Sequence, residues 1–557
     1  MDFTFNLGHY LYKFLRQNAK SIFTIPFFER FEIDINENAS CLIDFHPFLK
    51  YYTYFFCIRN TNDFINFYLS GLGTVIDISH NNKFGLLINS EKNGKKYFIW
   101  LPQVYSQICL DNFQRISISQ EIHSLYDWAW SPNNQIKIFN ISNKEAVTII
   151  PYVVIENVDQ NLFEEFQNSH CCENRLYLKS NWFSASTPKD IWKYLINGAI
   201  YDPRSDARVK KQFKCQQCAY AWWNYLGFLQ KKTRKKIYDF LQNEISCAVL
   251  ADMSSNGEWG HGYWSDDIET HSRFHLDGIQ LFLSQYEKTN DSVWLDAAEK
   301  SMDFFSKKLV EKIDNQKVWF LHDTLERKNK PKIKSTLCGK SIENSLCINT
   351  HVQALSVLHR LQNLDPDKKK YALLFNKGVG ALRCVFEHQP GEKLYQNVLE
   401  WLIKYKFLNR SNRILLKIKN DIIYRLLNKI YWPIVQLYPR IVHPCGFIER
   451  DLTLSMLSDR YHVINLKDLL TLYRQQPDEW LRPYIKKGIN VLQEYVKNNN
   501  LADAIQRSLY FIETIDTFYL YDKYIEKICY DELKKMENVI YEKTGGYSLD
   551  YCIAKEL

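Results

Sequence analysis

The sequence of 557 residues lacks the long apolar segments of membrane-spanning and exported proteins. No run of about 18 apolar residues occurs, so no transmembrane helix is predicted. The N-terminal stretch MDFTFNLGHYLYKFLRQNAKSIF has an acidic second residue, no uninterrupted apolar core and no small-residue cleavage pattern, so no signal peptide is expected. A chain of this length is too long for one ordinary core, so two or three domains are expected.

Several nucleotide-binding and hydrolytic motifs are also missing. The sequence contains no Walker loop, no GxGxxG after a strand and no GxSxG nucleophile elbow, which argues against the enzyme classes that depend on them. Basic residues are mostly dispersed and the net charge of +8 is mild for this size, so nucleic acid is not an expected partner.

Cysteine pairing signals are weak as well. The 14 cysteines are scattered through a large chain, which favours reduced thiols and therefore a cytoplasmic location. Cys215 and Cys218 form a CxxC pair, but no second pair accompanies them, and this favours buried thiols over a zinc site.

Aromatic residues are abundant, at 15% of the chain, and two different hydrophobic patterns divide the sequence. Short alternating or β-branched runs dominate the first two hundred residues, with Asn, Gly and Ser between them. This pattern predicts a β-rich, sandwich-like N-terminal domain over residues 1–190. The runs are SCLIDFH, YYTYFFCIRN, GTVIDIS, KFGLLIN, KYFIWL, QRISIS, QIKIFNIS and AVTIIPYVVIENV.

Residues 191–557 repeat a helical pattern in which two apolar-periodic stretches flank a short polar break. Each repeat predicts an antiparallel helical hairpin, and successive hairpins can stack in a line or close into a ring. The breaks contain Asn290 and Asp291, Asp365 and Pro366, and Gln476 and Pro477, and YLGFLQKKTRKKIYDFLQNEISC is a further candidate hairpin. The expected fold is therefore α+β and multidomain.

Long polar and aromatic segments lead into the first helix of each repeat, and they favour the ring. They are SSNGEWGHGYWSDDIETHSRFH, KSIENSLCINTHVQ and HPCGFIERDLTLSMLSDRYHV. In this layout the chain resembles the (α/α) toroid enzymes that act on carbohydrates, among them uronyl epimerases, polysaccharide lyases and glycoside hydrolases. A β-rich domain before a helical toroid is similar above all to the glucuronyl C5-epimerase and polysaccharide lyase type. The resemblance is architectural, runs from about Cys215 to the C-terminus and transfers no catalytic residue.

The segment NGEWGHGYWSDDIETHSRFHLDG gathers titratable groups and aromatic rings. If a helix starts near Asp266, then Asp267, His271 and His275 share one face. Sugars explain this mixture, because their CH faces stack on Trp and Tyr while their hydroxyls bond to carboxylates, amides and imidazoles.

Acid/base chemistry on a sugar needs proton donors and acceptors, and a uronate also needs a cation for its carboxylate. The helices that start near Asp266, Asn349 and Arg450 are expected to surround one cavity. The predicted catalytic residues are Glu258, Asp267, His271, His351 and Tyr461. The predicted substrate-binding residues are Trp259, His261, Tyr263, Trp264, Arg273, His275, Asn349, Gln353, Arg450 and His462, with the two arginines as anion clamps.

Structural and metal-binding roles compete for the same residues. Asp266 and Glu269 can form a capping box, and the tryptophans can fill a core. No cofactor is expected, but His271 and His275 have HxxxH spacing, so a divalent metal ion is the alternative. The HExxH signature is absent, and Arg273 between the two histidines opposes a cation.

These patterns predict an enzyme that acts by acid/base chemistry on an acidic poly- or oligosaccharide or on a lipid-linked saccharide. A uronyl C5-epimerase-like or lyase-like reaction is expected. The alternatives are a glycoside hydrolase of the toroid type, a non-catalytic glycan- or protein-binding toroid, and a toroid with another chemistry such as a terpenoid cyclase.

A basic amphipathic insertion interrupts the hairpins at about residues 409–442. Ile418, Ile422, Leu426 and Ile430 form an apolar stripe. The cations beside the stripe are Lys417, Lys419, Arg425 and Lys429. This composition suits a helix in a membrane interface, which would make the enzyme a peripheral protein at a membrane surface. An ordinary core helix with solvated Lys and Arg is the alternative.

Overall fold

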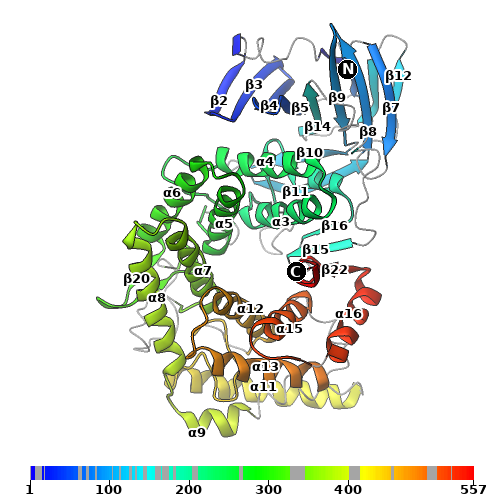
Figure 1. The fold of residues 1–557 in the computed structure, drawn as a ribbon. Coiled ribbons are helices and arrows are strands. Elements are labelled where there is room, and N and C mark those ends of the chain that lie inside the picture. Colours follow the sequence, from blue (N-terminus) through cyan, green and yellow to red (C-terminus); the bar gives the residue numbers. More distant parts are fainter. Residues whose placement is uncertain are drawn as a thin grey trace. The chain divides into compact units, whose positions relative to one another are not determined.

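A computed structural model of the chain describes residues 2–6, 16–17, 19–59, 65–70, 74–81, 85–102, 104–111, 115–124, 128–131, 135–141, 147–156, 165, 175–179, 183–202, 211–262, 268–326, 345–400, 414–452, 457–498, 511–528 and 530–556. The chain divides into two compact units, which are described separately. Unit 1 comprises Met1–Glu173, Ala185–Met253 and Trp259–Ile268, and unit 2 comprises Asn174–Ser184, Ser254–Glu258 and Glu269–Leu557. Figure 1 shows strands in the N-terminal part of the sequence and helices in the rest.

Unit 1 contains a large antiparallel sheet in which β2, β3, β4, β5 and β14 lie side by side. Beyond β5, β14 pairs with β10 through its first residues and with β9 through its last. The strands of this sheet are β2 (Lys20–Ile25), β3 (Phe28–Asn36), β4 (Ala39–His46), β5 (Tyr51–Ile58), β7 (Thr74–Asn81), β8 (Gly85–Lys92), β9 (Lys95–Leu101), β10 (Val104–Leu110), β11 (Ile116–Ser124), β14 (Val147–Glu156) and β19 (Lys211–Gln212). A second sheet joins β1 (Asp2–Asn6), β6 (Ile65–Ser70), β13 (Gln135–Ile141) and β12 (Trp128–Ser131).

The prediction of a β-rich N-terminal part is confirmed. Every apolar or alternating run quoted above falls on a strand, from β4 and β5 to β13 and β14. The reason is local, because side chains alternate between the two faces of a strand and a buried sheet needs apolar groups at every second position.

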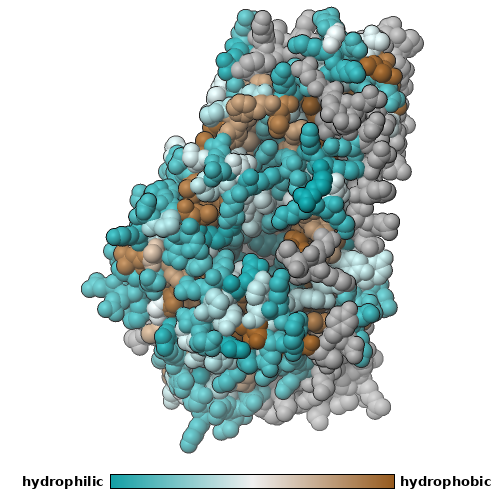
Figure 2. All heavy atoms as spheres, in the orientation of Figure 1, coloured by the Kyte–Doolittle hydropathy of each residue, from teal (hydrophilic) through white to brown (hydrophobic). Residues whose placement is uncertain are grey.

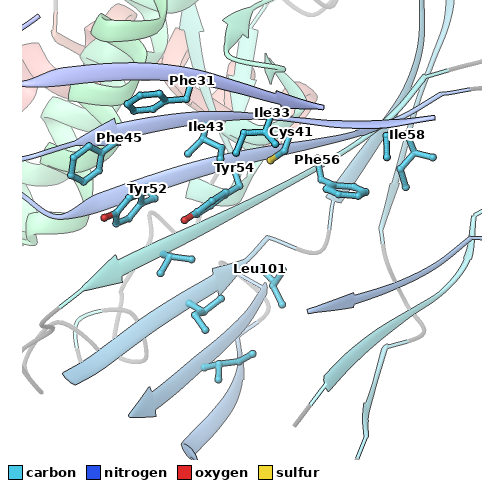
Figure 3. Packing of buried hydrophobic residues seen from close by; sticks show 14 of the residues in the cluster. Phe31, Ile33, Cys41, Ile43, Phe45, Tyr52, Tyr54, Phe56, Ile58 and Leu101 are labelled. Atoms are coloured by element: carbon cyan, nitrogen blue, oxygen red, sulfur yellow. The ribbon is translucent and has the colours of Figure 1, made fainter. Parts of the chain in front are cut away.

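One face of the sheet carries a hydrophobic cluster built from alternate residues of β3, β4 and β5 (Figure 3). Ile43 and Phe45 of β4 and Tyr54 and Phe56 of β5 project to this side, and Leu101 of β9 belongs to the same cluster. Phe45 and Tyr52 are paired across the two strands, and their rings stack at 4.5 Å between centroids. Such cross-strand aromatic pairs stabilise the register of the sheet.

The opposite face of β5 packs against helical segments of unit 1. These are η2 (Pro188–Lys193) and α4 (Lys236–Ala251). Helix α3 (Gln216–Thr233) packs on α4, and the short strands β17 (Leu195–Ile196) and β18 (Ala199–Ile200) lie between η2 and α3 in the sequence. Tyr51 stacks on Phe240 of α4, and Phe55 contacts Trp192 of η2. Because α4 packs against the sheet and α3 packs on α4, unit 1 extends beyond the expected boundary near residue 190.

Unit 2 is mainly helical, and the expected breaks separate paired helices. The hairpins are α5 (Ser272–Thr289) with α6 (Ser292–Lys308), α7 (Ile348–Leu364) with α8 (Lys369–Glu387), α12 (Asp459–Gln475) with α13 (Arg482–Asn498), and α15 (Phe511–Tyr524) with α16 (Tyr530–Thr544). Asn290 ends α5 in the left-handed conformation, and the Asp291 side chain caps α6 by accepting from the Val293 N–H. Turn chemistry in the sequence therefore places this hairpin correctly.

The first helices of these hairpins are neighbours, because α5 packs on α7, α7 on α12, and α12 on α15. Two small sheets accompany the helices: β20 (Val310–Lys312) pairs with β21 (Val318–Phe320) between α6 and α7, and β15 (Arg175–Lys179) lies between β16 (Phe183–Ala185) and β22 (Gly546–Ser548). The remaining elements are α9 (Glu392–Leu394), η4 (Tyr395–Leu399), α11 (Ile414–Leu437) and α17 (Leu549–Glu556).

The expected amphipathic insertion forms α11, a single helix with Pro433 inside it. Among the helices that the structure describes, none is both long enough and apolar enough to cross a membrane. On the face drawn in Figure 2, hydrophilic residues cover most of the described surface, and hydrophobic residues form small separate patches.

Candidate functional site

The starts of α5, α7 and α12 meet around the segment that follows β21. The Ser272 N–H at the start of α5 donates to the His322 carbonyl at 2.9 Å, and His271 forms a β-bridge with Asp323. The Ile348 N–H at the start of α7 donates to the Arg450 carbonyl, also at 2.9 Å. The guanidinium of Arg450 lies 4.8 Å over the ring of Tyr461, in the first turn of α12. Residues of all three helix starts are therefore linked by contacts.

Three side chains form a line at this junction. His322 Nδ1 lies 2.8 Å from Asp323 Oδ2, and Arg450 Nη2 lies 2.8 Å from His322 Nε2. A guanidinium only donates, so Nε2 must carry the lone pair and Nδ1 the proton, which it donates to the carboxylate. The line is therefore a neutral imidazole oriented by a carboxylate, with its basic nitrogen turned to an arginine.

The line is only partly buried. The side chains of Asp323, His322 and Arg450 keep 13%, 11% and 19% of their surface exposed. Burial lowers the pKa of Arg450, but Cys347, Tyr461 and Asp451 outweigh it and hold that pKa above its ordinary value. Arg450 therefore stays positively charged and can exchange its imidazole contact for an anionic ligand.

His271 lies next to this line, and Glu258 is bonded to the residue before His271. The His271 ring meets the His322 ring edge to face at 4.6 Å and stacks on Phe274. Thr270 donates through Oγ1 to Glu258 Oε1 at 2.6 Å, which holds the carboxylate beside the residue before His271. Of the predicted catalytic residues, His271 and Tyr461 contact members of the line. Glu258 is linked to it only through Thr270, the neighbour of His271, and Asp267 lies outside the described residues.

Arg273 has a different environment from Arg450. It forms a salt bridge of 2.5 Å with Asp468 of α12 and donates to the Asn349 carbonyl at 3.0 Å. Arg450 also faces a carboxylate, but its Nε lies 3.4 Å from Asp451 Oδ2, so its ion pair is longer than that of Arg273 and the geometry favours Arg450 as the anion clamp. Asn349 is buried, and its Oδ1 lies 2.8 Å from the Cys347 thiol.

A second polar group lies one helical turn further along α5. Asp277 accepts from Lys179 Nζ at 2.7 Å and from Gln353 Nε2 at 2.8 Å. The Gln353 side chain thus links α7 to α5, and it has no contact with the Asp323–His322–Arg450 line among the bonds that the structure describes.

Three predicted histidines have structural roles instead. His351 Nε2 donates to the Gly378 carbonyl of α8 and its Nδ1 accepts from the Phe320 N–H. His462 repeats this arrangement with the Gly488 carbonyl of α13 and the Ile448 N–H. His275 Nε2 contacts the Ser301 carbonyl and hydroxyl of α6.

Each of these histidines is the fourth residue of the first helix of a hairpin and ties that helix to its partner. Burial lowers the pKa of His275 and His462 to about 4 and that of His351 to about 3, so all three are neutral at pH 7. Backbone groups bond to both nitrogens of His351, so this geometry favours a structural role for it over the predicted proton transfer.

The aromatic wall expected from the opening segment is not found among its described residues. Trp259 is 1% exposed in unit 1 and donates through Nε1 to the Val249 carbonyl. His261 is equally buried, and its Nε2 lies 2.8 Å from Gln216 Oε1. Both belong to unit 1, and their burial removes them from substrate stacking. Tyr263 and Trp264 lie outside the described residues.

The metal alternative at His271 and His275 receives no geometric support. His275 reaches α6, while the His271 ring lies between Phe274 and His322. Within the part of the chain that the structure describes, no three His, Cys, Asp or Glu side chains are grouped to hold a metal ion. Cys215 and Cys218 are buried, and the cysteines that the structure describes form no disulfide with one another.

Sequence reasoning missed His322 and Asp323. They follow the strand VWF and Leu321 in the link between α6 and α7, for which no site residue was predicted. A His-Asp pair directly after a buried strand is a weak signal, but it was available.

Comparison with known proteins finds similarity to solved structures alone. No family model matches the chain, and no curated protein does. Solved structures similar to it include a polysaccharide lyase (12% identity, TM-score 0.28, covering 50% of this chain and 59% of that one) and an unsaturated glucuronyl hydrolase specific for heparin (13%, 0.29, 51% and 61%). A sugar epimerase from a ruminal bacterium is also similar (10%, 0.26, 51% and 76%). The matches to the polysaccharide lyase and to the glucuronyl hydrolase cover less than two thirds of those chains.

The solved structures that are similar to this chain are thus carbohydrate-active enzymes, as the sequence resemblance implied. At these TM-scores the similarity carries no argument about the reaction, which has to come from the site itself.

Proposed function

We propose that this chain is a carbohydrate-active enzyme of the (α/α) toroid type that acts on an acidic glycan, free or lipid-linked, by proton transfer. The observation that carries the proposal is the Asp323–His322–Arg450 line, a neutral imidazole base held between a carboxylate and a charged guanidinium. The similar solved structures include a polysaccharide lyase, a glucuronyl hydrolase and a sugar epimerase, and an acidic glycan substrate is consistent with these activities.

The line suggests how a uronate would be bound and activated. The sugar carboxylate pairs with Arg450, which lets the guanidinium leave His322 Nε2. Pairing the carboxylate with a cation stabilises the negative charge that develops when the proton on the adjacent carbon is removed. His322 Nε2 takes this proton, and Asp323 stabilises the imidazolium that forms.

The reaction then needs an acid. Tyr461, whose ring lies under Arg450, and Glu258, held by Thr270, are the candidate donors. Return of a proton to the opposite face of the carbon inverts it, which is epimerisation. Protonation of the oxygen at the neighbouring carbon, with cleavage of its bond to that carbon, leaves a double bond, which is elimination. His271 contacts the His322 ring and positions it.

Hydrogen exchange at the carbon next to the carboxylate tests this proposal directly. The intact protein is incubated in D₂O with uronate-containing and neutral oligosaccharides, including lipid-linked ones, and the products are followed by NMR. On uronate substrates only, we expect one of two results. Epimerisation places deuterium at the carbon beside the carboxylate and inverts it, whereas elimination removes the hydrogen of that carbon and leaves a double bond. His322→Ala should lower this rate by about 10²–10⁴-fold.

The matched control is His359→Ala, on the far part of α7, which should keep the full rate. Cleavage of glycosidic bonds with neither deuterium uptake nor a double bond would support a glycoside hydrolase instead. Tight glycan binding without any conversion would support a non-catalytic binding toroid.

A further inference from the structure

Helix α11 presents an apolar stripe to solvent. Ile422, Leu426, Ile430 and Leu437 are 55%, 56%, 51% and 74% exposed. Large aliphatic side chains with this exposure, spaced four to seven residues apart on one helix, form a continuous face rather than isolated surface residues.

The opposite side of α11 holds the helix to unit 2. Tyr431 and Val435 are buried, and the Tyr431 hydroxyl donates to Glu449. At about 100° per residue, these two positions lie on the side of the helix away from Ile422 and Leu426. The stripe is therefore the outer face of an anchored helix, and Figure 1 draws α11, in yellow, along an edge of unit 2.

Cations border the stripe. Arg425 and Lys429 are exposed and lie on the helix beside Ile422, Leu426 and Ile430. An apolar face bordered by cations matches the interface of an anionic bilayer, where acyl chains receive the aliphatic groups and lipid phosphates or carboxylates pair with the cations. A protein partner with a purely apolar groove would not use the cations.

We propose that α11 docks this protein onto an anionic lipid surface, with the stripe in the interface and Arg425 and Lys429 at the headgroups. Docking keeps the enzyme at the membrane plane and needs no transmembrane segment. The proposal stands independently of the reaction assigned above.

Vesicle flotation tests the docking. The full-length protein is mixed with vesicles of phosphatidylcholine alone or of phosphatidylcholine with phosphatidylserine. We expect flotation with the anionic vesicles, weaker flotation with the neutral ones, and loss of binding as salt is raised. Ile422→Asp with Leu426→Asp should reduce the bound fraction by about tenfold or more, because two apolar side chains leave the interface.

Two further variants separate the contributions. Arg425→Glu with Lys429→Glu should abolish the preference for anionic lipid and leave the weak neutral binding. Leu373→Asp is the matched control, because Leu373 is 58% exposed on α8, and it should float like the unchanged protein. Circular dichroism of each variant checks that the helices are intact.

Equal recovery of the unchanged protein and the Ile422/Leu426 variant in the soluble fraction would overturn the proposal. Light scattering gives a second way to overturn the proposal. If the unchanged protein were a dimer and the Ile422/Leu426 variant a monomer, a second copy of the chain would cover the stripe.

Discussion

Two clusters of this protein are built from the same residue types and differ in burial. In unit 1, Arg30 forms a bidentate pair with Asp44 at 2.5 and 2.6 Å, and His46 lies 2.8 Å from Glu244. In unit 2, Asp323, His322 and Arg450 form the line described above. The first cluster is closed to solvent, since the Asp44 and Glu244 side chains are 0% exposed, whereas the second keeps part of every side chain exposed.

Burial changes what the first cluster can do. It raises the pKa of Glu244 to about 7 and lowers that of His46 to about 4. Burial raises the pKa of Asp44 to about 7 as well, but the charge of Arg30 opposes that rise. Because Asp44 also accepts both bonds from Arg30, we assign the negative charge to Asp44 and the proton to Glu244. The cluster is a neutralised structural link between β4 and α4, and the comparison shows that solvent access, not residue type, separates a link from a candidate site.

The largest expected effects come from replacing an aspartate by asparagine in each of the two clusters, since the two variants should respond differently. Asp323→Asn should lower the uronate-dependent deuterium exchange rate by about 10²–10⁴-fold, because the imidazole loses its orienting carboxylate. Its free energy of unfolding should fall by only about 1 kcal/mol, since one partly exposed hydrogen bond is weakened.

Asp44→Asn should leave the exchange rate per folded molecule unchanged and lower the stability strongly. It leaves the Arg30 guanidinium buried without its counter-charge, which costs about 3–5 kcal/mol of unfolding free energy. Urea unfolding of both variants, with exchange rates measured per folded molecule, checks the pair. Equal stability losses for the two variants would remove the distinction between link and site.

The next effect is a pH dependence of stability. An acid whose pKa is higher in the folded than in the unfolded protein binds more protons when folded, so its contribution to stability falls as pH rises. For Glu244 this pH dependence falls between about pH 4.5, the ordinary pKa of the side chain, and about pH 7, its pKa in the folded protein. The unfolding free energy of the unchanged protein, relative to Glu244→Gln, should therefore fall by about 1–3 kcal/mol between pH 5 and pH 8.

Comparison with Glu244→Gln isolates this group, because His46 is present in both proteins and its lowered pKa acts in the opposite direction. Glu287→Gln, at a side chain that is 46% exposed, is the control and should show no such trend. A relative stability that rises with pH would contradict the assignment of the proton to Glu244.

The smallest effect concerns the repeated histidines of unit 2. His462→Ala should lower the unfolding free energy by about 1–3 kcal/mol, because the Ile448 N–H and the Gly488 carbonyl lose their buried partner. Catalytic exchange per folded molecule should stay unchanged, in contrast to His322→Ala. A loss of exchange in His462→Ala without a loss of stability would place this histidine in the site.

Much of the secondary structure could be predicted from the sequence. The alternation in SCLIDFH and YYTYFFCIRN predicted β4 and β5, and Asn290 with Asp291 predicted the turn between α5 and α6. The start of α5 was predicted less well. It begins at Ser272 rather than near Asp266, because His271 is held in an extended bridge to Asp323.

The sequence by itself determined those features whose cause is local, namely strand alternation, helical periodicity, turn residues and the amphipathic stripe of α11. Only the tertiary structure decided which polar residues meet. His275, His351 and His462 look like site residues at helix starts, but each bonds to a carbonyl 26 or 27 residues away. His322 meets Arg450 across 128 residues. Spacing along one helix carries no information about such partners, because packing between helices brings them together.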